Sequence, residues 1–161
     1  MYATPAFERK LCTADELATR VAKLPRPVVF TNGCFDVLHR GHVTYLAQAR
    51  ALGAALIVGV NSDASVKRLG KGDDRPINLQ QDRMMVLAAL ESVSMVVLFE
   101  EDTPLNLIIA CRPDVLVKGG DWQPDSIVGA KEVKSWGGTV HSIPFLHERS
   151  TTSLLNKIRS L

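Results

Sequence analysis

Five short apolar segments, rich in β-branched residues, alternate with amphipathic segments along most of the chain. The apolar segments cover residues 28–32, 56–61, 95–99, 115–117 and 139–143, and helical patterns cover residues 43–52, 79–90, 104–111, 126–136 and 152–158. Apolar strands separated by helices are typical of a parallel sheet that is covered by helices on both faces. The sequence therefore predicts an α/β fold, a doubly wound domain with a five-stranded parallel sheet.

The first 26 residues precede this pattern and predict one additional helix. Thr13, with Glu16 three positions later, forms the capping box of a helix start, and two prolines end the apolar pattern that follows. No repeat or low-complexity linker separates the chain into parts. We therefore predict a single domain over residues 1–161, in which an N-terminal extension and helix (1–26) precede the core (27–161).

Composition excludes several classes of protein. The chain has 161 residues, of which 46% are hydrophobic and 22% charged, and its formal net charge is +2. These values describe a globular protein rather than a disordered one, and the charge is too small to indicate a nucleic-acid partner. We expect small-molecule substrates, no nucleic acid and no membrane.

The N-terminal residues, the lengths of the apolar stretches and the cysteines indicate where in the cell the protein is located. The N-terminal residues lack the basic and apolar segments of a secretory signal, and no apolar stretch approaches the length of a membrane-spanning helix. The three cysteines, Cys12, Cys34 and Cys111, have no metal-type spacing, which favours reduced thiols. We therefore predict a cytoplasmic enzyme.

The segment between the first strand and its helix, residues 32–42, reads N-G-C-F-D-V-L-H-R-G-H. His39 and His42 lie where the helix begins, and a first helical turn carries unpaired N–H groups and the positive end of the helix dipole. Phosphate oxygens bind there, and an imidazole can stabilise charge on a phosphoryl group in transfer. Gly41 between them lets a substrate approach closely. The alternative is that both histidines are ordinary surface or capping residues.

A charged segment follows the second strand. Residues 67–75 contain four cationic side chains and two glycines, which indicates a mobile loop that could close on polyphosphate. Lys67 and Lys71 are both candidates for that contact, and Arg83 on the next helix is a candidate for the nucleotide. The alternatives are a solvated loop and a surface arginine.

Two further segments follow the fourth and fifth strands. Residues 118–121, K-G-G-D, would bring Lys118 close to a sugar phosphate, with Asp121 accepting hydrogen bonds from sugar hydroxyls. Residues 149–152, R-S-T-T, begin the last helix and offer a second anion site. The alternatives are a glycine turn and simple helix caps. Because ligands bind beyond the carboxyl ends of parallel strands, we expect all these segments to converge.

Residues 33–42 resemble the G-x-F-D-x-x-H-x-G-H signature of the cytidylyltransferase-like nucleotidyltransferases. Within that group the chain is most similar to the heptose 1-phosphate nucleotidyltransferases of the lipopolysaccharide pathway. The similarity extends over residues 28–158 and includes segments 60–69, 74–78, 99–104, 117–122 and 150–152. Trp122 stands where family members usually carry tyrosine.

The resemblance implies a Rossmann-like domain of the nucleotidyltransferase type. The implied reaction transfers a nucleotidyl group from ATP, with Mg²⁺, to D-glycero-D-manno-heptose 1-phosphate, giving ADP-heptose and pyrophosphate. The alternatives are a GDP-heptose-forming guanylyltransferase, an enzyme like glycerol 3-phosphate cytidylyltransferase, and a non-enzymatic nucleotide-binding regulatory module. A homodimer is also compatible with the resemblance.

The resemblance also implies the site residues, and it leaves open the metal ligands and the choice between Lys67 and Lys71. The implied catalytic residues are His39, His42, Lys67 and Lys71. The implied nucleotide-binding residues are Thr31, Asn32, Gly33, Phe35, Asp36, Gly41, Asn61, Arg83, Arg149, Ser150, Thr151 and Thr152. The implied sugar-phosphate-binding residues are Asp36, Lys118, Gly119, Gly120, Asp121 and Trp122.

Overall fold

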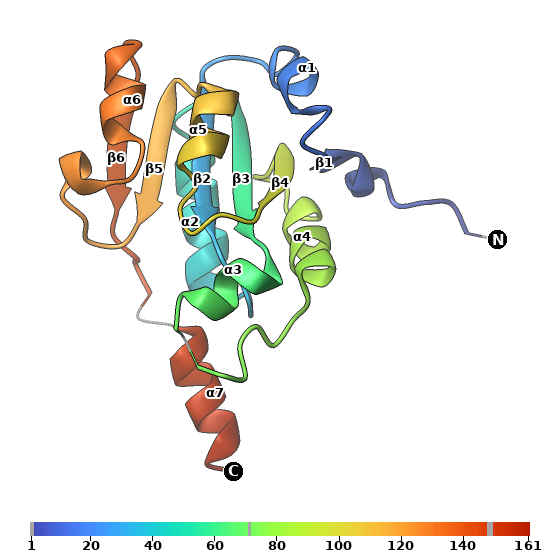
Figure 1. Cartoon of the computed structure of the whole chain (residues 1–161). Coiled ribbons are helices and arrows are strands. Elements are labelled where there is room, and N and C mark those ends of the chain that lie inside the picture. Colours follow the sequence, from blue (N-terminus) through green and yellow to red (C-terminus); the bar gives the residue numbers. More distant parts are fainter. Residues whose placement is uncertain (1, 71, 148–149) are drawn as a thin grey trace.

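The computed structural model describes residues 2–70, 72–147 and 150–161 of the chain. Its described strands form one parallel sheet in the spatial order β1-β4-β3-β2-β5-β6 (Figure 1). The strands are β1 (Leu11–Cys12), β2 (Val28–Gly33), β3 (Ala55–Asn61), β4 (Met95–Phe99), β5 (Val115–Gly119) and β6 (Thr139–Ile143). The predicted α/β class and parallel sheet are confirmed.

Seven α-helices connect or follow these strands in the described part of the chain. They are α1 (Leu17–Val21), α2 (Arg40–Arg50), α3 (Asp63–Arg68), α4 (Gln80–Ala88), α5 (Leu105–Cys111), α6 (Ala130–Ser135) and α7 (Thr151–Arg159). Two short 3-10 helices cover Ala6–Lys10 and Pro124–Ser126. Among the described helices, none combines the length and the apolar character that are needed to cross a membrane.

Helices cover both faces of the sheet because side chains alternate along each strand. Val28 and Phe30 of β2 pack with α1, α5 and α6 on one face, whereas Val29 packs with α2 and α4 on the other. On β3, Ile57 faces the first cluster and Val58 the second. The central strands β2 and β3 are therefore buried on both sides, which explains their nearly continuous apolar sequences.

The structure corrects three details of the sequence prediction. The sheet has six strands rather than five, because the two-residue β1 pairs with β4 at its edge and is too short to give an apolar pattern. Helix α3 occupies residues that were predicted as a loop, and the Ser62 side chain caps it by accepting a hydrogen bond from the Ser65 N–H at 3.1 Å. Helix α6 begins at Ala130, four residues later than predicted.

The strand order reverses between β2 and β5, and these two strands separate toward their carboxyl ends. Their pairing ends at Phe30 and Leu116, although both strands continue for three further residues. The hydroxyl of Tyr45 lies between the separated strands, 2.5 Å from Thr31 Oγ1 and 3.4 Å from the Val117 carbonyl, and Tyr45 lines the space that opens beyond them. A crevice therefore opens at this switch point, where doubly wound folds bind ligands.

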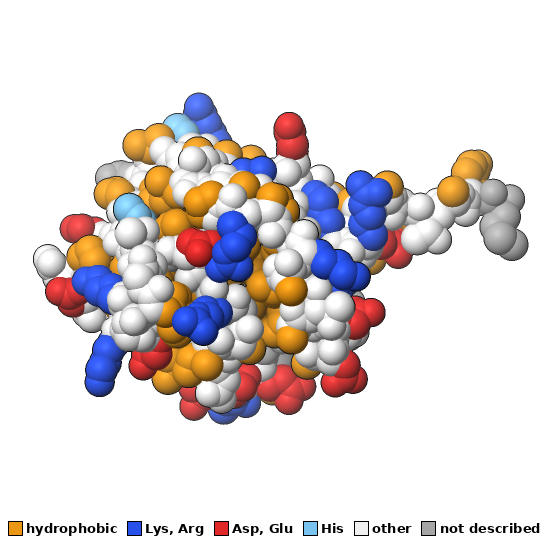
Figure 2. All heavy atoms as spheres, turned by 90° about the horizontal axis from the view of Figure 1, so that it is seen from above, with side chains coloured by type: hydrophobic (Ala, Val, Ile, Leu, Met, Phe, Trp, Pro, Cys, Tyr) orange, Lys and Arg blue, Asp and Glu red, His pale blue; other side chains and the backbone are white. Residues whose placement is uncertain are grey.

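Helices α3 and α7 lie at the carboxyl end of the sheet, below the strands in Figure 1. Figure 2 views the molecule from the other end, where the strands begin. On that face Lys and Arg side chains are interspersed with Asp and Glu side chains and with hydrophobic atoms, and the N-terminal segment extends away from the body.

Candidate active site

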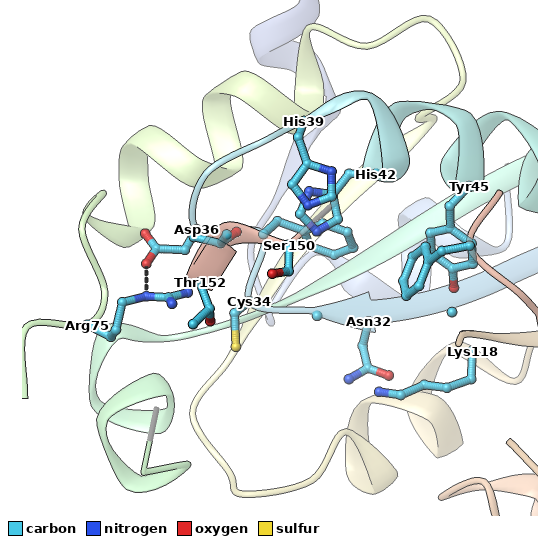
Figure 3. Close-up of a pocket in the computed structure, with 15 residues that line it drawn as sticks. Asn32, Cys34, Asp36, His39, His42, Tyr45, Arg75, Lys118, Ser150 and Thr152 are labelled. Carbon is cyan, nitrogen blue, oxygen red and sulfur yellow. Dashed lines mark hydrogen bonds and ion pairs between the residues drawn. The ribbon is translucent and has the colours of Figure 1, made fainter. Parts of the chain in front are cut away.

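A pocket of about 410 Å³ opens at the carboxyl ends of β2 and β5 (Figure 3). The starts of helices α2 and α7 complete its wall. The pocket is lined by Asn32, Gly33, Cys34, Phe35, Asp36, His39, His42, Tyr45, Arg75, Lys118, Gly119, Phe145, Ser150, Thr151 and Thr152. The predicted convergence of the segments after β2, after β5 and before α7 is therefore observed.

The two histidines lie side by side at the start of α2. His39 is the residue that precedes the helix, with extended backbone angles, and His42 lies in the first turn. Their rings stack with centroids 3.9 Å apart and an angle of 22° between the planes. Phe35 contacts the His42 ring edge to face at 5.4 Å, from a left-handed backbone conformation with φ of 48°. This geometry presents two imidazoles and a helix N-terminus to one point of the pocket.

Gly41 packs directly against the His39 ring. A Cβ atom at this position would lie 3.0 Å from both Cε1 and Nδ1 of His39, closer than ordinary van der Waals contact. The glycine therefore has a steric function, because any side chain would move the imidazole.

Replacing Gly41 with alanine is expected to lower kcat while leaving stability nearly unchanged. The Cβ would displace the His39 ring, whereas alanine favours the helix by up to about 1 kcal/mol. Steady-state kinetics together with urea unfolding checks this. A G41A protein with unaltered kcat would contradict the steric role.

Asp36 is a buried anchor for the segment that precedes α4. Its carboxylate accepts hydrogen bonds from Arg75 Nε at 2.5 Å and from the backbone N–H groups of Ile77 and Asn78 at 2.9 Å. The Asn78 amide nitrogen also donates to the Asp36 carbonyl. Burial by itself would raise the pKa of Asp36, but these hydrogen bonds and the Arg75 charge lower it overall.

This lowered pKa predicts a loss of stability in acid. Because the folded pKa lies below the unfolded value of about 3.9, Asp36 stabilises the folded state above that value and ceases to do so as the pH falls through the folded pKa. Urea unfolding at a series of pH values should show the loss, and D36N should show a shallower dependence below about pH 4. Identical slopes for the two proteins would contradict it.

Arg83 is fully buried rather than exposed on the surface of α4. Its guanidinium donates to the Cys34 carbonyl at 2.7 Å, to the Asn78 carbonyl at 3.0 Å and to the Asp63 carboxylate at 2.8 Å. It therefore joins the histidine segment, the segment before α4 and helix α3. Asn61 is also buried, and its amide donates to Ser65 Oγ at 3.0 Å.

The end of β5 forms the opposite side of the pocket. Lys118 Nζ lies 5.9 Å from the centroid of the Trp122 ring, and the Trp122 indole donates to the Gly119 carbonyl at 3.1 Å. Gly120 has a φ of 114°, which lets the chain reverse so that Trp122 lies beside Lys118. Lys118, Trp122 and Asn32 also line a smaller pocket of about 120 Å³.

Helix α7 begins at the pocket with three hydroxyl side chains. Ser150 caps it by accepting a hydrogen bond from the Ser153 N–H at 3.0 Å, and Thr151 donates to the Val37 carbonyl at 3.2 Å. The latter bond fixes the start of α7 to the segment that carries the histidines. Two helix N-termini therefore face the same pocket.

Several predicted residues lie elsewhere. Lys67 is exposed on α3 and outside the pocket lining, and Asp121 is exposed in the turn after β5. Thr31 is buried beneath the pocket against Tyr45. Lys71 and Arg149 lie outside the described residues. Arg75 was predicted only as one cation of the charged segment 67–75, and no motif indicated Tyr45 or Phe145, but all three line the pocket.

The described residues do not form a protein-built Mg²⁺ site. They contain no group of three or more His, Cys, Asp or Glu side chains close enough to hold a metal ion. Among the described lining residues Asp36 is the only carboxylate, and its oxygens contact Arg75 and two backbone amides.

Comparison with known proteins identifies relatives over nearly the whole chain. The cytidylyltransferase-like family matches residues 30–160. A D-beta-D-heptose 1-phosphate adenylyltransferase of Bordetella bronchiseptica is 59% identical over 155 residues, which cover 95% of this chain and 96% of that protein. The bifunctional protein HldE of Campylobacter fetus is 52% identical over 95% of this chain, but the chain spans only 32% of that protein.

Solved structures of other proteins share the fold of this chain. The lipopolysaccharide core biosynthesis protein of Thermoplasma volcanium has a TM-score of 0.62 and 28% identity, with 76% of this chain and 98% of that chain covered. The pantoate-beta-alanine ligase of Francisella tularensis shares the fold, with a TM-score of 0.59 and 15% identity over 94% of this chain and 78% of that chain. The family match, the relative of equal length and the histidine pocket at the strand switch point lead to one conclusion: the chain belongs to the cytidylyltransferase-like family and is a nucleotidyltransferase.

Proposed function

We propose that this nucleotidyltransferase transfers the adenylyl group of ATP to D-glycero-D-manno-heptose 1-phosphate, giving ADP-heptose and pyrophosphate for lipopolysaccharide core synthesis. The observation that carries this proposal is the stacked pair His39 and His42 at the start of α2, which shares one pocket with the start of α7. The substrate assignment is supported by the 59% identity to a heptose 1-phosphate adenylyltransferase.

The reaction is a single displacement at phosphorus. An oxygen of the sugar phosphate attacks the α-phosphorus, a new P–O bond forms, and the bond from the α-phosphorus to the bridging oxygen breaks. That oxygen takes the bonding electron pair and leaves as part of pyrophosphate. No covalent enzyme intermediate is required, so the protein contributes positioning and charge stabilisation.

The histidines are the catalytic residues in this proposal. Their imidazole N–H groups donate to the oxygens of the α-phosphoryl group, where negative charge is redistributed in the transition state. The N–H groups of the first turn of α2 add to this stabilisation. Because the two rings are held by stacking and by Phe35, little reorganisation is needed during the reaction.

The remaining lining residues bind the two substrates. The start of α7, with Ser150 to Thr152, binds phosphate oxygens of the triphosphate. Lys118 and Gly119 bind the sugar phosphate at the opposite side, beside Trp122. Asn32 and Gly33 approach the nucleotide from the end of β2. In this proposal Asp36 and Arg83 hold these segments in position rather than contacting substrate.

We propose that Mg²⁺ binds together with the triphosphate. Mg²⁺ in nucleotide sites is commonly held by substrate phosphates and water with few protein ligands, which agrees with the side chains of the pocket. When bound, it would neutralise charge on the phosphates.

The direct test is pyrophosphate release with Mg²⁺ and each of ATP, GTP and CTP, paired with the α and β anomers of heptose 1-phosphate. Mass spectrometry of the sugar nucleotide identifies the product. Turnover with ATP and heptose 1-phosphate supports the proposal. Turnover with GTP, or with CTP and glycerol 3-phosphate, would replace it with the corresponding transferase, and binding of ATP without turnover would indicate a nucleotide-binding regulatory module.

We also propose a cytoplasmic location. Cys12, Cys34 and Cys111 are all buried, and burial raises the pKa of Cys111 to about 12. Buried cysteines of this kind suit a reducing compartment. A homodimer stays a prediction that light scattering in solution would decide.

A further inference from the structure

Arg75 is a buried cation in the pocket wall, and it comes from the charged segment that the sequence predicts as a mobile loop able to close on polyphosphate. Its side chain is only 6% exposed, and it lines the same pocket as the two histidines. A buried guanidinium is costly unless its charge is compensated. Its environment therefore indicates what it can bind.

Asp36 compensates the charge through one edge of the guanidinium. Within the described part of the chain, the guanidinium donates only through Nε, to Asp36 Oδ2. The Asp36 carboxylate also accepts hydrogen bonds from the N–H groups of Ile77, at Oδ2, and of Asn78, at Oδ1. Asp36 thus fixes the orientation of Arg75 through Nε and hydrogen-bonds to neither terminal nitrogen. The two terminal nitrogens form the fork that binds phosphate in a bidentate manner.

The guanidinium lies next to the start of α7. In Figure 3, Arg75 extends from Asp36 toward Thr152 at one end of the pocket. Thr151 and Thr152 belong to the first turn of this nine-residue helix, so its N–H groups and dipole favour an anion at the same place. A buried cation and a helix N-terminus therefore meet at this end.

Two cationic side chains lie at opposite ends of the pocket, on either side of the two histidines. Figure 3 places Arg75 at one end, Lys118 at the other, and His39 and His42 between them. A nucleotidyl transfer needs this arrangement, because the attacking and leaving oxygens lie on opposite sides of the α-phosphorus. Lys118 already faces the side that is proposed for the sugar phosphate.

We propose that Arg75, oriented by Asp36, binds the β- and γ-phosphates of the triphosphate and remains bound to pyrophosphate as it leaves. This inference rests on the proposed function. As the bond from the α-phosphorus breaks, negative charge grows on the departing pyrophosphate oxygen, and the guanidinium offsets it. The α-phosphorus lies at the histidines and the acceptor phosphate enters from the Lys118 side.

The test compares R75Q and R75K with the wild type by isothermal titration calorimetry. Inorganic pyrophosphate and AMP are the two probes, because only pyrophosphate corresponds to the proposed contact. R75Q should weaken pyrophosphate binding by about tenfold or more and leave AMP binding within about twofold. The pyrophosphate affinity of R75K should lie between those of the wild type and R75Q, because a single ammonium cannot pair with Asp36 and bind phosphate at the same time.

The matched control is R26Q. Arg26 also pairs with an aspartate, Asp114, at 3.0 Å, but at the end of the sheet where β2 begins. R26Q should bind both probes as the wild type does. Circular dichroism verifies folding, and R75K decides the result if R75Q does not fold.

Pyrophosphate affinity of a folded Arg75 variant within twofold of the wild type would overturn the inference, and so would a wild type that binds no pyrophosphate. A failure of the proposed function would give a different experimental result. A wild type that binds pyrophosphate through Arg75 but forms no ADP-heptose would leave this contact in place and refute the substrate assignment.

Discussion

Replacing His42 with alanine is expected to lower kcat for pyrophosphate release by about 10²- to 10⁴-fold, with little change in the KM for ATP. The imidazole contacts the phosphoryl group most strongly when charge is redistributed in the transition state, so its loss affects the rate more than binding. H39A should behave in the same way, because the two rings stack at 3.9 Å and act on one group. Their effects should not add when combined.

The measurement is steady-state kinetics with both substrates varied. H141A is the matched control, because His141 lies on the edge strand β6, outside the pocket lining, and its side chain hydrogen-bonds to Thr139 Oγ1 at 3.1 Å. H141A should retain the wild-type kcat. A rise in KM for H42A, with kcat unchanged, would show that His42 binds the ground state and would remove it from the catalytic role.

Much of the fold could be predicted because its strands are buried on both faces. The continuous apolar segment 95–99 has the same bounds in the sequence prediction and in the structure, and so does the edge strand 139–143, whose residues are partly buried or exposed. The position of the site could be predicted for a related reason. All parallel strands end at the same edge, so segments that follow them must meet there.

Strand β1 and helix α3 could not be predicted because their stability comes from distant contacts. The two residues of β1 pair with Val96 and Val97 of β4, more than 80 positions away, and no local pattern encodes that. Helix α3 is only six residues long, with Ser65 and Val66 buried, so its apolar pattern is too short to recognise.

The functions of charged residues were the hardest to predict. Arg75 and Arg83 are both buried, and their partners Asp36 and Cys34 lie 39 and 49 positions away. From the sequence alone an arginine is expected to be exposed to solvent, because most arginines in folded proteins are. Only the folded chain shows that one lines the pocket and the other supports it.

Replacing Arg83 with methionine is expected to lower the free energy of unfolding by about 3–5 kcal/mol, out of a total of roughly 5–15 kcal/mol. Methionine fills most of the buried space but donates no hydrogen bond. The carbonyl groups of Cys34 and Asn78 would then lose a charged donor while buried, and each unsatisfied group costs about 1–3 kcal/mol. Asp63 would also lose its partner, although it is partly exposed and can be hydrated.

Urea unfolding at neutral pH measures this change through the transition midpoint. R26M is the control, because Arg26 is half exposed and its ion pair with Asp114 should contribute about 1 kcal/mol or less. Under conditions where R83M remains folded, kcat should fall as well, because the Cys34 carbonyl belongs to the segment that leads to the histidines. A fully stable R83M enzyme with reduced nucleotide affinity would instead mean that Arg83 contacts the nucleotide, as the family resemblance implies.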